Sequence, residues 1–293
     1  MPSFYLSSSS VPDSVSSVSA SAVNWKRLEP KNPGTKEPKN ALVLSAGGMY
    51  GAYEAGAWKA LADVFHPDLI VGASIGAVNG WAIAGGCEPD ELIHRWCSLE
   101  EAGHYRWKVP KTVFGGVLDS EPLQRAIQDI HKSFQPRIEY AMVLTDLLRL
   151  RPRVFQAGEV TWQHLVATTA IVGIFDQMRI GRRLYSDGGL LCAVPIWAAA
   201  ELGATKALVI DVLPESPGVF AKIFVGAIRL ISPFHAVTPA SMPIVKVGPA
   251  KLLGSPTDSL YWSRKNVEEW IRQGERDATA IKHSIADCFG RSS

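Results

Sequence analysis

The stretch Asp68-Leu69-Ile70-Val71-Gly72-Ala73-Ser74-Ile75-Gly76 decides the fold of this chain. Its first four residues are typical of a short buried strand, and the small residues that follow permit a sharp turn into a helix. Such a turn pushes the side chain at its centre, here Ser74, out of the edge of the sheet. Because the turn crowds its neighbours, the positions two before and two after the serine must be small, and Gly72 and Gly76 occupy them.

Alternating strands and helices extend from this turn in both directions. Short apolar runs predict strands at residues 41–45, 68–71, 141–144, 154–155 and 207–210, and a hairpin at 178–185. Helices are predicted at residues 53–61, 75–85, 89–99, 162–170 and 195–202. This order predicts an α/β fold in which a mostly parallel sheet is covered by helices on both faces.

The first 39 residues differ in composition from the rest of the chain. Residues 7–21 are rich in Ser and Val, and residues 29–40 are rich in Pro, Lys and Gly. Such segments bury too little apolar surface to offset the entropy of ordering, so residues 1–39 are predicted to be a disordered tail. A processed targeting segment is the alternative. Residues 40–293 are predicted to form the folded domain.

Composition excludes several classes of function. The 293 residues carry a formal net charge of only +2, which does not favour a nucleic-acid partner. The four cysteines are scattered and lie at no metal-ligand spacing, so we predict no metal and no disulfide framework. No basic, apolar leader and no apolar run of about 18 residues is present, so we expect a cytoplasmic location.

A glycine-rich loop, residues 46–51, follows the first predicted strand. Such a loop can aim backbone N–H groups at an anion, either a nucleotide phosphate or the oxyanion of an acyl intermediate. A dinucleotide site would need a further glycine at Ala46 and a later acidic residue, and a phosphate-binding P-loop would need Gly-Lys-Ser/Thr. Neither pattern is present. A simple packing turn remains possible, but the nearby Ser74 favours an oxyanion site.

A serine nucleophile needs a base. The seven histidines lie mostly in predicted helices or before proline, where a surface or capping role is the more common one. Asp187 is the better candidate, in Tyr185-Ser186-Asp187-Gly188-Gly189. An aspartate before two glycines is usually only a turn, but this one lies between the predicted hairpin and a helix led by Pro195.

Taken together, these motifs resemble the patatin-like phospholipases. The resemblance covers about residues 40–285 and includes the glycine-rich loop, the Ser74 turn and the Asp187 turn, in the same order. Residues 117–123 resemble the segment before the family's middle helix. Residues 194–204 resemble the segment after its aspartate, and residues 266–278 resemble its terminal helix.

The resemblance implies a three-layer α/β/α fold and hydrolysis of lipid or other acyl esters, with no cofactor. Ser74 would attack the ester carbonyl and Asp187 would accept its proton directly, in a dyad without histidine. An apolar pocket would have to raise the pKa of this aspartate for it to act as a base. The amides implied for the oxyanion are those of Gly47, Gly48 and Met49. The supporting motif glycines are Gly51, Gly72, Gly76, Gly188 and Gly189.

Two residues depart from the family pattern. Ala46 stands where glycine is usual, which matters if that position needs positive φ, at a cost of about 1 kcal/mol. Tyr50 stands where a cation is usual and so removes a positive charge beside the loop, although its hydroxyl can still donate a hydrogen bond. Both put the rate and the head-group preference in question.

Three further expectations concern binding and the alternatives. Residues 219–231 form an amphipathic pattern that could lie in a lipid interface, although packing against the sheet is the more ordinary explanation. An α/β-hydrolase triad would use His235 or His283, the histidines that follow Asp187. A catalytically weak fold with a scaffold, storage or binding role is the non-enzymatic alternative. The oligomeric state is left open.

Overall fold

A computed structural model describes residues 38–99, 106–110, 112, 114–213, 232–234, 236–237 and 242–289. Residues 1–37 of the predicted tail lie outside the described residues, as does the amphipathic segment 219–231. Within the described part of the chain, no helix is both long enough and apolar enough to cross a membrane.

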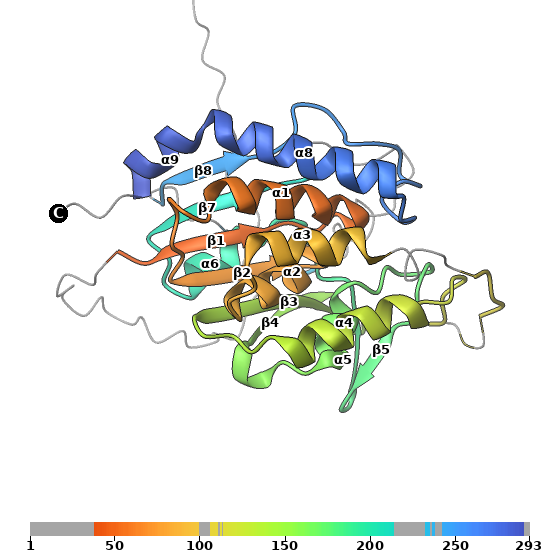
Figure 1. Ribbon diagram of the computed structural model, residues 1–293. Helices are drawn as coiled ribbons and strands as arrows, with labels where there is room; N and C mark the ends of the chain where they lie inside the picture. The colour runs from red at the N-terminus through yellow and green to blue at the C-terminus, as the bar shows by residue number, and fades with distance from the viewer. Residues whose placement is uncertain are drawn as a thin grey trace, which may run out of the picture. The chain divides into compact units, whose positions relative to one another are not determined.

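In the part of the chain that the structure describes, a sheet of eight strands forms the centre of the fold (Figure 1). Its strands follow the order β5-β6-β3-β2-β1-β7-β8, and β4 also pairs with β3. The run from β3 to β8 is parallel, whereas β4, β5 and β6 pair in antiparallel fashion. Their bounds are β1 Asn40–Leu44, β2 Leu69–Ala73, β3 Glu139–Asp146, β4 Arg151–Gln156, β5 Met178–Ile180, β6 Arg183–Ser186, β7 Lys206–Ile210 and β8 Ile244–Val247. The predicted α/β class with a mostly parallel sheet is confirmed.

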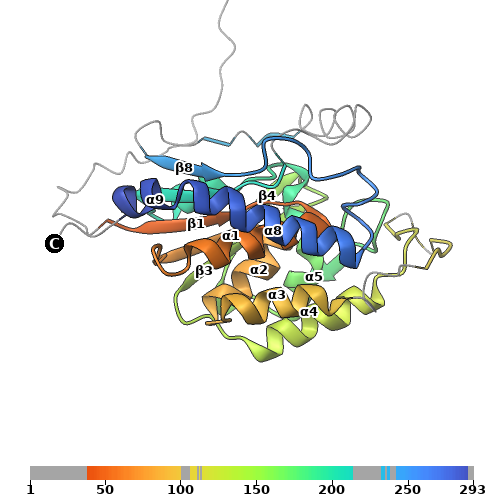
Figure 2. The same ribbon diagram turned by 45° about the horizontal axis from the view of Figure 1, so that its top comes forward.

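Helices cover both faces of this sheet and complete the predicted three layers. Figure 2 shows α1, α2, α3 and α4 gathered on one side of the strands, and Figure 1 shows α6 on the other. The helix bounds are α1 Gly51–Leu61, α2 Ile75–Ala84, α3 Pro89–Cys97, α4 Glu121–Ser133, α5 Trp162–Thr168, α6 Ile196–Glu201, α8 Arg264–Ala280 and α9 Lys282–Phe289.

The alternation of side chains along β1 explains why helices cover both faces of the sheet. Leu42 and Leu44 are buried in the larger core, under α1 and α2, whereas Ala41 and Val43 are buried in the smaller core with Trp197 of α6. Successive side chains of a strand point to opposite faces, so a strand covered on both sides must be apolar throughout. The continuous apolar run at 41–44 therefore follows from burial on both faces.

The helices α1 and α8 pack together unusually closely. A Cβ atom added to Gly56 would lie 2.0 Å from the backbone oxygen of Ile271, and one added to Gly274 would lie 2.1 Å from that of Tyr53. The Tyr53 hydroxyl also donates to Asp277 at 2.9 Å. Since α1 begins directly after the glycine-rich loop, this contact holds the base of that loop.

Candidate active site

The topology of the sheet brings the ends of two strands together. β2 ends at Ala73 and β6 ends at Ser186, and the two strands pair with β3 at positions two residues apart. β2 runs parallel to β3 and β6 runs antiparallel to it, so the two strands approach each other end to end. The next residue after each strand, Ser74 and Asp187, therefore meet at the carboxyl end of β2.

The side chains of Ser74 and Asp187 form a short hydrogen bond. Ser74 Oγ donates to Asp187 Oδ2 at 2.6 Å, and the other carboxylate oxygen accepts from Gly189 N–H at 2.6 Å. Both residues are buried, with 4% and 7% of their surface exposed. Burial raises the pKa of Asp187 from 3.8 to about 6, although the two hydrogen bonds act in the opposite direction. The pKa of this carboxyl group thus lies well above that of an ordinary aspartate.

The turn at Ser74 has the geometry of a nucleophile elbow. Ser74 has φ 53° and ψ −129°, a conformation that residues with a side chain rarely adopt. A Cβ added to Gly72 would lie 2.4 Å from the Gly76 oxygen, and one added to Gly76 would lie 2.4 Å from the Ser45 oxygen. These are backbone contacts that cannot move aside, so both positions require glycine.

Two buried threonines hold the elbow and the aspartate, and neither was predicted from the sequence. Thr168 Oγ1 accepts from Ser74 N–H at 2.9 Å and donates to the Val143 oxygen at 2.9 Å. Thr145 Oγ1 donates to the Asp187 backbone oxygen at 2.9 Å. Thr168 lies 94 residues from Ser74 in sequence. The sequence offered only a weak signal: Thr168 lies near the end of a predicted helix, and Thr145 directly follows a predicted strand.

The glycine-rich loop lies beside the dyad, and its amides are not equivalent. Met49 N–H donates to the Ser259 oxygen at 2.8 Å and is therefore already occupied. Gly48 has φ +58°, and a Cβ there would lie 2.2 Å from the same Ser259 oxygen. Within the described residues, no acceptor is bound to the N–H groups of Gly47 and Gly48. These two amides are the ones available to an oxyanion.

The two departures from the family pattern have different consequences. Ala46 is not among the described residues with positive φ, so this alanine carries no such strain. The Cβ atom of Ala46 instead packs against Gly189. A Cβ atom added to Gly189 would lie 2.4 Å from the Ala46 Cβ. The Tyr50 hydroxyl donates to the Ser255 oxygen at 2.6 Å, and its ring meets Trp270 edge-on at 4.9 Å. That hydroxyl is therefore not free to donate to an oxyanion.

A buried carboxyl group lies below the loop. Glu54 of α1 accepts a hydrogen bond from Asn79 of α2 at 2.8 Å, and Asn79 in turn accepts one from Trp96 of α3 at 3.0 Å. Burial raises the pKa of Glu54 well above its usual 4.5, which favours its neutral form. This chain of polar side chains ties together the three helices that support the loop.

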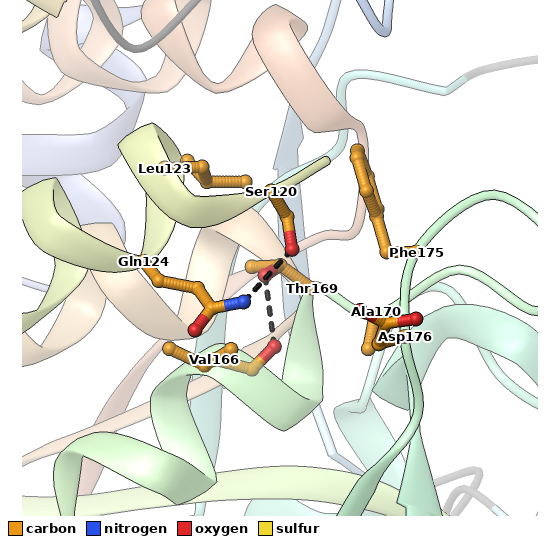
Figure 3. Close-up of a pocket in the computed structure, with 8 residues that line it drawn as sticks. All are labelled: Ser120, Leu123, Gln124, Val166, Thr169, Ala170, Phe175 and Asp176. Atoms are coloured by element: carbon orange, nitrogen blue, oxygen red, sulfur yellow. Dashed lines mark hydrogen bonds between the residues drawn. The ribbon is translucent and has the colours of Figure 1, made fainter. Parts of the chain in front are cut away.

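Two hollows adjoin Ser74. The narrower one lies between the loop and α4, and the wider one opens on the Asp187 side. The apolar side chains of the narrower hollow are Met49, Ile75, Leu123, Ile171, Phe175 and Leu260. Figure 3 shows a small cavity that shares Leu123, Thr169 and Phe175 with this hollow. Two of the residues that line this cavity are joined to each other, since Gln124 donates to Ser120 Oγ at 2.9 Å.

No histidine in the described part of the chain is among the residues that line these hollows. His283 lies on α9, whose Cys288 oxygen accepts a hydrogen bond from Lys206, the first residue of β7. That is the amino end of the parallel strands, and Ser74 lies at their carboxyl end. His235, the other candidate for a triad, lies outside the described residues. The described residues thus place Asp187, and no histidine, beside the serine.

Comparison with known proteins identifies the family of this chain. The sequence model of the family described as patatin-like phospholipase matches residues 42–200, which is more than half of the chain. The chain belongs to the patatin-like phospholipase family. The match contains the loop, the elbow and the aspartate turn, but not α8 or α9.

Relatives of this patatin-like chain include bacterial and animal proteins. An NTE family protein of Mycobacterium tuberculosis is 31% identical over 189 residues, which cover 63% of this chain and 52% of that protein. The human patatin-like phospholipase domain-containing protein 6 is 26% identical, over 59% of this chain and 13% of its own length. The match thus spans about half of the first relative. Among solved structures, VipD of Legionella pneumophila is similar with a TM-score of 0.44 at 11% identity, covering 87% of this chain and 67% of its own.

Proposed function

We propose that this patatin-like chain is a lipid acyl hydrolase in which Ser74 is the nucleophile and Asp187 the general base. The observation that carries the proposal is the 2.6 Å hydrogen bond from the serine hydroxyl to a buried carboxyl group whose pKa is raised to about 6. A base with this pKa is mostly ionised at neutral pH, so it can accept the serine proton there. Family membership supports the ester as substrate.

The reaction would proceed in two halves. In the first, Ser74 Oγ attacks the ester carbonyl carbon while its proton moves to Asp187 Oδ2. Collapse of the tetrahedral intermediate then breaks the ester bond, and Asp187 returns the proton to the departing alcohol. In the second half, water attacks the acyl-enzyme and gives a proton to Asp187. Release of the carboxylic acid returns that proton to Ser74.

The developing negative charge would be held by the N–H groups of Gly47 and Gly48. These amides carry no other acceptor within the described residues, and the loop is fixed by close contacts on both sides. A preorganised donor of this kind is worth about 3 kcal/mol in the transition state. Met49, the third amide implied by the resemblance, is bound to Ser259 and would act by fixing the loop instead.

The two hollows would divide the substrate between them. The narrower hollow is lined mainly by apolar side chains, which suits an acyl chain whose carbonyl lies at Ser74. The wider hollow, on the Asp187 side, suits the alcohol that receives the proton. The narrower hollow shares Thr169 and Phe175 with the cavity in Figure 3. These two residues would border the end of the acyl chain that is farther from its carbonyl group.

Hydrolysis of p-nitrophenyl butyrate and labelling by a fluorophosphonate test the dyad. Ser74→Ala should lose both hydrolysis and labelling, and Asp187→Asn should lose hydrolysis and label slowly. Ser284→Ala and Asp287→Asn make the same changes at exposed positions of α9 and should behave as the unaltered protein. Full activity of Asp187→Asn would refute its role as base. Absence of activity and labelling in the unaltered protein would favour a non-catalytic role.

A further inference from the structure

Three exposed apolar side chains cluster in the segment before α4. Trp107, Val109 and Phe114 are 76%, 86% and 47% exposed. Exposed apolar side chains that lie close together are the usual feature of surfaces that contact a partner or a membrane, so this segment is a candidate for such a contact. We call the described residues of 106–118 the apolar arm.

The arm is held by its own backbone pairing. Lys108 N–H donates to the Val117 oxygen at 2.9 Å, and Asp119 N–H donates to the Arg106 oxygen at 2.8 Å. Trp107 thus lies opposite Leu118 in an antiparallel bridge. The exposed side chains are therefore carried on a paired backbone.

The arm is joined to the rim of the proposed active site. Leu118 N–H donates to the Ile174 oxygen at 3.0 Å, and Gln177 N–H donates to the Phe114 oxygen at 3.1 Å. The segment of chain that follows α5 carries these contacts and also lines the two hollows. Ile171 borders both hollows, and Phe175 borders the narrower one. In Figure 1 the arm, in yellow, lies beyond the carboxyl ends of the parallel strands, the end at which Ser74 lies.

Charged residues of both signs lie in and next to the arm. The acidic ones that follow it along the chain are Asp119, which is half-buried, and Glu121, which pairs with Arg125. Arg106 of the arm and Arg179 of β5, two residues beyond Gln177, are exposed, and neither forms an ion pair within the described part of the chain. The nearby acidic side chain of Asp176 is already neutralised by Lys108, to which it is bound. An anionic partner would therefore meet cations here.

We propose that the apolar arm is the surface by which this protein docks on an anionic lipid bilayer. Aromatic and aliphatic side chains flanked by arginines are the combination that an interface of acyl chains and anionic head groups favours. Docking here would set the rim at residues 171–175 against the bilayer, so that a lipid could reach Ser74 with a short displacement. The inference rests on the proposed function for its substrate, but the docking itself does not require catalysis.

Co-sedimentation of the full chain with vesicles tests the docking. Vesicles of phosphatidylcholine that contain phosphatidylglycerol should bind the protein, and vesicles of phosphatidylcholine alone should bind it more weakly. Trp107→Asp and Val109→Asp should each weaken binding about tenfold or more, the loss of about 1.4 kcal/mol. Ile138→Asp, at the amino end of β3 and 36% exposed, should leave binding unchanged. Equal binding by all four proteins would overturn the proposal.

Two readouts separate this proposal from the proposed function. Ser74→Ala should bind vesicles normally yet hydrolyse nothing, so docking can be present even if catalysis is absent. Trp107→Asp should hydrolyse monomeric p-nitrophenyl butyrate at the normal rate but lipid in vesicles at least about tenfold more slowly. Size-exclusion chromatography supplies the competing outcome. If Trp107→Asp changes the oligomeric state and leaves vesicle binding unchanged, the arm is a protein interface and the proposal is wrong.

Discussion

Asp187 sets the pH range in which the proposed chemistry can operate. Its carboxyl group must be ionised to accept the Ser74 proton, and burial raises its pKa to about 6. We expect kcat/KM for a soluble ester to be constant above this pKa and to fall about tenfold per pH unit below it. A pH–rate profile of the unaltered protein measures this. A profile that stays flat down to pH 4, near the ordinary aspartate pKa, would contradict the role of Asp187.

The raised pKa of Asp187 also makes the stability of the folded protein depend on pH, and this dependence can be measured independently of activity. Because the folded-state pKa is above the unfolded value of 3.8, ionising Asp187 favours the unfolded chain. The stability that this carboxyl group contributes is thus full below pH 3.8 and is lost as pH rises through about 6. A shift of this size corresponds to about 3 kcal/mol. Asp187→Asn does not ionise, so urea denaturation should show its stability relative to the unaltered protein rising as pH increases from 3.8 to about 6. The variant should be inactive throughout this range.

Among the elements, the elbow between β2 and α2 depends on a residue from α5. Thr168 Oγ1 joins Ser74 N–H to the Val143 oxygen, which fixes the strained turn against β3. Thr168→Val preserves shape but removes both hydrogen bonds, so the turn should be free to relax away from Asp187. We expect kcat to fall about tenfold or more with little change in KM, since the change affects alignment and not the apolar hollow.

The conservative change Thr168→Ser separates positioning from packing. Its hydroxyl can restore both hydrogen bonds although a methyl group is lost, so most of kcat should return while stability stays below that of the unaltered protein. Fluorophosphonate labelling rates should follow kcat in the two variants. If valine and serine variants have equal kcat, Thr168 contributes only packing.

Local sequence carried much of the information about these elements. The apolar runs of β1, β2, β3 and β7 are visible because burial on both faces demands them, and Gly72 and Gly76 mark the elbow because only a hydrogen atom fits there. Asp187 was predicted as the candidate base because its turn lies between a predicted hairpin and a helix led by Pro195, and the structure places it beside Ser74. In contrast, the bonds of Thr168 to Ser74 and of Ser259 to Met49 join residues far apart in sequence. No periodicity encodes such contacts, which is why the sequence alone left all three loop amides equivalent.

At the scale of the whole molecule, α8 supports the glycine-rich loop although it lies outside residues 42–200, which the family model matches. It packs along α1, and the turn before it supplies Ser255 and Ser259, which bind Tyr50 and Met49. The carboxyl-terminal part of the chain therefore fixes the glycine-rich loop from one side while α1 holds it from below. The stability of the α1–α8 contact and the activity of the dyad should consequently change together.

The variant Gly274→Ala tests this coupling. Its Cβ would lie 2.1 Å from the Tyr53 oxygen and 2.9 Å from the Ala57 nitrogen, both backbone atoms, so α8 must move away from α1. Overpacking of this kind costs about 1–3 kcal/mol, which urea denaturation resolves. Because the turn carrying Ser259 moves with α8, kcat should fall as well. The matched change Gly158→Ala, where no atom lies within 4 Å of the added Cβ, should alter neither quantity. Loss of stability in Gly274→Ala with full kcat would show that the loop keeps its geometry without α8.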